Sequence, residues 1–152
     1  MKKFEFRLAS VLRLRETRLA AEKIKLQELL AERERLQESL DSYEKEQKDA
    51  LAWVHNTQGA NSADLRALSA FQLGSKARRA TVQRAIQSCE TDIQEQRFRL
   101  MQAERNQKLL LKLKEKRLAS WQYDADRELE IIAQEAWQSA ARKRQLATRE
   151  PL

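Results

Sequence analysis

The histidine and the cysteine of this sequence are the side chains best suited to chemistry near neutral pH, and neither has the neighbours that such chemistry needs. His55 is the only histidine, and no cluster of Cys, Asp or Glu beside it could complete a metal site. Cys89 is the only cysteine and falls on an apolar helical spacing. We therefore expect a solvated turn residue at position 55 and a small buried side chain, not a reactive thiol, at position 89.

The sequence also lacks the motifs of common enzyme classes. Phosphate-cradling loops need several glycines, nucleophile elbows need G-x-S-x-G and zinc proteases need H-E-x-x-H, but this chain has two glycines and neither of the other patterns. A two-helix structure is also not expected to hold a concave pocket. We predict a protein that is not an enzyme, with no catalytic residue, no metal and no cofactor.

The composition is typical of long helices. The 152 residues include only two glycines and one proline, and 35% of them are charged. Aromatic residues make up 6%, and the mean hydropathy is -0.78, which is too little apolar bulk for a broad core. No window approaches the roughly 20 apolar residues of a membrane span, and arginines interrupt the opening apolar run, which argues against a secretion signal. The single cysteine excludes an internal disulfide and favours a reducing cytoplasm.

A 3.5-residue apolar repeat indicates a coiled coil in the first third of the chain. Ten of fourteen positions reached from Leu8 by alternating steps of four and three residues are apolar or aromatic, through to Val54. The repeat stops at HNTQGANSAD, where Gly59 can adopt positive φ and Asn61 can cap a new helix with Asp64 three residues later. The pattern predicts an all-α fold, a long antiparallel two-helix coiled coil or helical hairpin.

A second apolar repeat follows the turn. It begins at Leu65 and continues to Leu110, and Gly74 inside it suggests a bend, so that a separate short helix near residues 62–73 is one option. We predict a single elongated domain over residues 1–152, with arm one at about 6–55, a turn at about 56–61 and arm two at about 62–147.

The second arm is longer than the first, so residues beyond about 125 should overhang. This stretch still carries the apolar residues Leu129, Ile132 and Trp137. Either the N-terminal FEFRL segment packs back along it, or it forms a helical docking face for a partner.

Positive charge is concentrated away from the turn. Residues 2–25 carry net charge +5 and residues 97–118 carry +6, whereas residues 28–49 carry -4. Such a field would steer the protein toward an acidic ring, an anionic membrane or nucleic acid. Nucleic acid is disfavoured because the basic residues 97–118 contain one aromatic residue, Phe98.

Two stretches resemble the FliJ family of the flagellar type III export apparatus. They are Phe4-x-Phe6-x-Leu8 followed by VLRLRE, and the later run LKLKEKRLASWQYDADRELEIIAQEAW. The resemblance implies an antiparallel coiled coil similar to the central stalk of rotary ATPases. It implies as partners the hexameric export ATPase FliI, the export gate protein FlhA and export chaperones, with peripheral membrane association through them at the cytoplasmic face of the inner membrane near the flagellar base.

The resemblance also implies a gate-contacting surface on both helices near the turn, here including Leu40, Tyr43 and Phe71. Past Phe71 the chain departs from the family pattern, with Gly74, Ser75, Arg78 and Val82. As a hypothesis from the charge pattern, contacts to the ATPase ring are made by Arg13, Arg15, Arg18, Lys112, Lys114 and Lys116.

The sequence therefore predicts an accessory stalk or chaperone-escort protein of flagellar export that acts by binding. Two other readings stay open: a basic helical module for nucleic acid or anionic membrane, and the equivalent stalk of a virulence secretion system. The helices could also pair between chains, which would make the protein a dimer.

Overall fold

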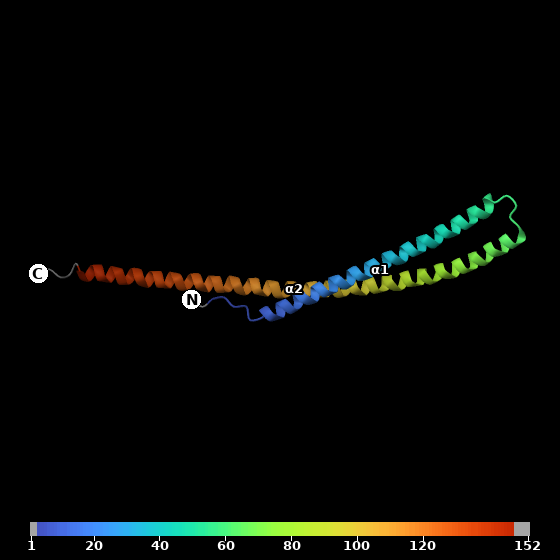
Figure 1. Ribbon diagram of the computed structural model, residues 1–152. Helices are drawn as coiled ribbons and strands as arrows, with labels where there is room; N and C mark the ends of the chain where they lie inside the picture. The colour runs from blue at the N-terminus through green and yellow to red at the C-terminus, as the bar shows by residue number, and fades with distance from the viewer. Residues whose placement is uncertain (1–2, 148–152) are drawn as a thin grey trace. The chain divides into compact units, whose positions relative to one another are not determined.

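Two long α-helices make up most of the part of the protein that the structure describes. The computed structural model describes residues 3–147, with helix α1 at Ala9–Asn56, helix α2 at Ser62–Ala147 and a short turn between them (Figure 1). No strand occurs in that part of the chain. This confirms the predicted all-α helical hairpin. Contacts divide the chain into two compact units, one of residues 17–104 and one that joins residues 1–16 to residues 105–152.

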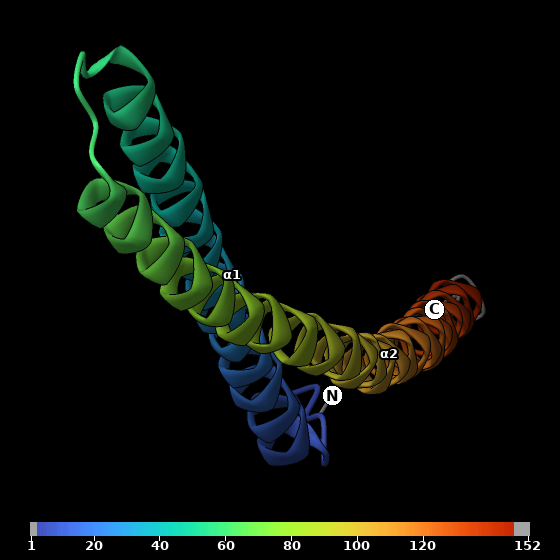
Figure 2. The same cartoon turned by 90° about the vertical axis from the view of Figure 1, so that its right-hand side faces the viewer.

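Within residues 17–104, α1 and α2 run antiparallel and pack along a single seam (Figure 2). The most buried side chains on this seam include Leu19, Cys89 and Ile93. The α1 residues of the predicted repeat are buried or half-buried from Leu19 to Val54, except Arg33, which is exposed and reaches Glu90 of α2 at 3.3 Å. The repeat predicted this seam because a 3.5-residue period keeps one helix face toward the partner helix.

The turn is built from local hydrogen bonds. At the end of α1 the backbone N–H and the hydroxyl of Thr57 both donate to the carbonyl of Trp53, at 3.1 and 2.7 Å. Gly59 has φ of +101°, a left-handed conformation that L side chains rarely adopt. Asn61 then caps α2, because its Oδ1 accepts from the N–H of Asp64 at 2.9 Å while the Asp64 carboxylate accepts from the N–H of Asn61 at 3.0 Å. This reciprocal pair is a capping box.

Helix α2 continues through Gly74 without a break. The separate helix considered at residues 62–73 is therefore not formed. A glycine costs an α-helix about 1 kcal/mol relative to alanine, but Ser75 beside it is 2% exposed and Phe71 before it is half-buried. Packing on both sides of Gly74 outweighs the local penalty.

The other unit holds the N-terminal segment and the C-terminal part of α2. Residues 3–8 are not helical, and the Phe4 ring lies 6.0 Å from the ring of Trp121. Leu12 and Ala125 are buried in this unit. Across the described residues, neither helix is long and apolar enough to cross a membrane.

Candidate functional site

The end of the hairpin nearest the turn carries an apolar groove of about 400 Å³. Its lining comes from both helices and comprises Ala50, Trp53, Val54, Asp64, Ala67, Leu68 and Phe71. Trp53 is 60% exposed, and the Asp64 carboxylate is already used in the helix cap. The expectation that two helices offer no concave pocket is thus too strong. The groove suits an apolar side chain of a partner, since its one charged group already has a hydrogen-bond donor.

The three residues expected to contact the export gate do not all share this groove. Phe71 is half-buried and lines it. Leu40 and Tyr43 lie on the helix seam, also half-buried, and are not part of the lining. The guanidinium carbon of Arg78 lies 5.6 Å from the centre of the Tyr43 ring, a cation–π contact across the two helices.

A polar cluster that the apolar repeat did not predict lies next to Tyr43. Arg79 of α2 donates to Gln47 Oε1 at 2.8 Å and to Glu44 Oε1 at 3.0 Å, both on α1. The Arg79 Nε atom is buried and has no hydrogen-bond partner among the described residues. Counting back from Val82 by three and then four residues reaches Arg79 and Ser75, so the spacing of α2 carried a signal for this cluster.

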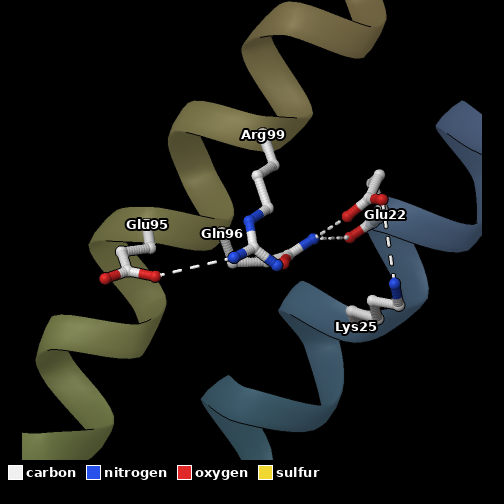
Figure 3. A network of polar contacts seen from close by, with 5 residues as sticks. All are labelled: Glu22, Lys25, Glu95, Gln96 and Arg99. Atoms are coloured by element: carbon white, nitrogen blue, oxygen red, sulfur yellow. Dashed lines mark hydrogen bonds and ion pairs between the residues drawn. The ribbon is translucent and has the colours of Figure 1, made fainter.

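A second polar layer crosses the seam between Glu22 and Gln96 (Figure 3). The Gln96 amide is 4% exposed and donates to the backbone carbonyl of Glu22 at 3.1 Å and also to its carboxylate. Lys25 approaches the same carboxylate at 3.8 Å. Glu22 stood on the predicted seam. Gln96 was missed because it is polar, although it lies three residues after Ile93 and four before Leu100, on the spacing of the α2 repeat.

Neither Cys89 nor His55 has a reactive setting. The Cys89 thiol donates to the backbone carbonyl of Leu29 at 3.4 Å. Burial raises the pKa of this thiol above its ordinary value, and the nearby Asp92 carboxylate adds to that effect, so little thiolate forms at neutral pH. His55 is exposed and lies in the last turn of α1. Within residues 3–147, no three His, Cys, Asp or Glu side chains gather where they could hold a metal ion.

The six basic residues expected at the ATPase ring fall in both compact units. Arg18 belongs to the unit of residues 17–104, and the other five belong to the unit with the chain's N-terminal segment. Arg15 is half-buried, whereas Arg13, Arg18, Lys112, Lys114 and Lys116 are exposed.

Beyond Ala125, α2 is a helix without cover from the described residues. Every residue from 126 to 140 is exposed, including Leu129 at 56%, Ile132 at 60% and Trp137 at 74%. The N-terminal segment reaches Trp121 through Phe4. The alternative that this segment packs along Leu129, Ile132 and Trp137 is therefore wrong for residues 3–8, because the segment meets α2 before the overhang begins.

Comparison with known proteins identifies a family. The family model described as "Flagellar FliJ protein" matches residues 4–130, which is most of the chain. No match was found among curated proteins or among solved structures. The chain belongs to the flagellar FliJ protein family, and with it to the non-enzymatic components of the flagellar export apparatus.

Proposed function

We propose that this protein is a stalk-like accessory factor that binds both the export ATPase FliI and the export gate protein FlhA. It acts by binding, not by catalysis. Export chaperones are further partners, and the protein works in the cytoplasm at the inner membrane near the flagellar base, held there through its partners. The family match supports this assignment, because family members are components of the export apparatus.

The observation that carries the proposal is the apolar groove beside the turn. Hollows of similar volume lie elsewhere along the hairpin, but charged and polar side chains make up much of their lining. The groove of about 400 Å³ at Trp53 and Phe71 differs in that its lining is mostly apolar. Monomers rarely leave apolar concave surface of this kind without a binding role. A gate contact near the turn would use this groove for an apolar side chain of FlhA.

The three proposed gate residues would contribute unequally. Phe71 lines the groove, so a gate side chain can reach it without moving the helices. Tyr43 has the Arg78 guanidinium over its ring, and Leu40 is half-buried on the seam. We therefore expect Phe71 to contribute most to FlhA binding, and Leu40 and Tyr43 to act mainly by holding the seam.

The basic residues supply the proposed contact to the FliI ring. Lys112, Lys114 and Lys116 are exposed on α2, and Arg13 is exposed on the first turns of α1 in the same unit. Exposed charges raise the rate of association with an acidic surface more than they raise affinity. We expect ring contacts from these residues to be sensitive to salt, with Arg15 of the same unit adding to the positive field. Arg18, in the other unit, is proposed as a separate contact.

Titration of the cytoplasmic domain of FlhA with the full chain tests the gate contact. We expect Phe71→Ala to weaken binding by about tenfold, since a half-buried aromatic anchor is lost. The matched control is Leu73→Ala on the same helix, because Leu73 is 69% exposed and lies outside the apolar groove. Equal binding by the wild type and Phe71→Ala, with unchanged helix content, would remove the groove from the proposal.

A further inference from the structure

The uncovered part of α2 keeps an apolar stripe on one face. Leu129, Ile132, Ala136 and Ala140 follow spacings of three and four residues, so they share a face with Ala125. Ala125 is 7% exposed, whereas Leu129 and Ile132 are 56% and 60% exposed. The face that is buried at Ala125 therefore continues, apolar and open to solvent, toward the end of the helix.

Charge divides this open segment into two halves of opposite sign. Residues 124–135 contain five acidic residues and one basic residue, for a net charge of -4. Residues 136–145 contain three basic residues and no acidic residue, for a net charge of +3. The charge changes sign near Ala136, which is also close to the midpoint of residues 126–147, the part of α2 beyond Ala125.

We propose that a second copy of this chain covers the stripe, with the two α2 segments antiparallel and Ala136 of each copy near the same residue of the other. In this register Glu130 of one copy lies at the same level along the helix pair as Arg142 of the other. A parallel pair would instead align acidic with acidic and basic with basic residues, which is destabilising. The charge pattern of the segment therefore complements that of a second copy running in the opposite direction, as a two-fold symmetric interface requires.

The length of the open segment fits the same register. When Ala136 faces Ala136, the last helical residue Ala147 falls opposite Ala125 of the second copy. At Ala125 the stripe is still buried by the rest of the same chain, and after Ala125 it is exposed. The second helix therefore fills the uncovered stretch and stops where the chain's own packing begins.

The small side chains at the centre allow the two helices to approach closely, and Trp137 beside them is the largest exposed side chain of the segment. The contact spans about 20 residues of each helix, roughly 30 Å, which is smaller than the interfaces of stable dimers. The dimer is therefore weak and forms reversibly as concentration rises.

Sedimentation equilibrium of the full chain alone, over about 1 to 300 µM, tests the dimer. The wild type is expected to shift from the monomer mass of 17.8 kDa toward twice that mass. Glu128→Lys, Glu130→Lys and Glu135→Lys together take residues 124–135 from a net charge of -4 to +2, and this reversal is expected to weaken the dimer by about tenfold. Arg142→Glu with Lys143→Glu takes residues 136–145 from +3 to -1 and is expected to weaken it similarly. All five changes in one chain restore self-association, because the two halves again carry opposite charge, +2 and -1.

The matched control is Glu28→Lys with Glu34→Lys and Glu38→Lys, a charge change equal to that in the acidic half, at exposed positions of α1, and it leaves dimerisation unchanged. Circular dichroism checks that each variant keeps its helix content. A wild type that stays monomeric throughout, half-reversed variants that dimerise as well as the wild type, or a fully reversed chain that fails to dimerise would each overturn the antiparallel pairing. None of these measurements uses FliI or FlhA, so they test the dimer independently of the proposed function.

Discussion

The side-chain nitrogen of Gln96 donates to two oxygens of Glu22, the backbone carbonyl at 3.1 Å and the carboxylate (Figure 3). This relationship places a polar pair inside a seam that is otherwise largely apolar. A buried polar pair favours one register of two helices, because any slip takes the Gln96 amide away from both of its acceptors.

Replacing Gln96 with Leu is expected to lower the free energy of unfolding by about 1–2 kcal/mol, since the Glu22 oxygens lose their buried donor. Urea denaturation followed by circular dichroism at the helix band measures the change. Adding Glu22→Leu to Gln96→Leu should recover most of this loss, because an apolar pair replaces the polar one. Gln83→Leu at an exposed position is the control, and a loss of similar size there would rule out the pair as the cause.

Arg79 is expected to stabilise the hairpin more than its neighbour Arg78. Arg79 donates to both Glu44 and Gln47 across the seam, whereas Arg78 has a cation–π contact with Tyr43 from an exposed position. We expect Arg79→Ala to cost about 1–2 kcal/mol and Arg78→Ala about 0.5 kcal/mol. Thermal unfolding of the two variants gives the comparison, and a larger effect of Arg78→Ala would contradict it.

The N-terminal cap of α2 is expected to affect both the stability of the hairpin and binding at the groove. Asn61→Ala removes the acceptor for the N–H groups of Ala63 and Asp64 and should cost about 1 kcal/mol. Because Asp64 lines the groove and takes part in the cap, the same variant should also weaken FlhA binding. Asn56→Ala, at the last residue of α1, serves as a comparison. If Asn61→Ala unfolds like the wild type, the cap does not stabilise the turn.

Cys89 is expected to react slowly with iodoacetamide in the folded protein and at the rate of a free thiol in urea, because burial holds the thiol neutral. The raised pKa in the folded state also predicts a pH effect. The thiol contributes stability that is fully present below its ordinary pKa of about 8.5 and is lost as pH rises through the folded pKa. The stability difference between the wild type and Cys89→Ala should therefore be constant from about pH 6 to 8 and shrink above about pH 9. A difference that grows with pH would contradict the burial of the thiol.

Much of the fold could be predicted because a coiled-coil seam is a local property of sequence. The 3.5-residue repeat of α1 identified the seam from Leu19 to Val54, and the turn chemistry of Gly59 and Asn61 identified the hairpin. The polar seam residues of α2 were harder to predict from the sequence. Gln96, Arg79 and Ser75 stand at three- and four-residue spacings from apolar seam residues of α2. They are polar, however, and an apolar pattern does not mark polar residues.

The interaction surfaces were even harder to predict from the sequence, because they depend on how segments distant in the chain pack together. The groove at Trp53 and Phe71 arises from two helices that meet imperfectly beside the turn, which neither helix pattern reveals alone. The extent of the N-terminal cover on α2 likewise depends on the contact between Phe4 and Trp121. Arm lengths predicted that an overhang exists, but not whether residues 3–8 would cover it.

The rate of ATP hydrolysis by the cognate FliI, measured across its assembly concentrations with and without this protein, tests the central claim most directly. We predict faster hydrolysis and hexamers at lower FliI concentration in its presence, and loss of that effect when Lys112, Lys114 and Lys116 are all replaced by Glu. A control chain with Lys45, Lys48 and Lys76 replaced by Glu has the same net charge and should retain the effect. Unchanged hydrolysis together with no binding to FliI would contradict a stalk-like role for this chain.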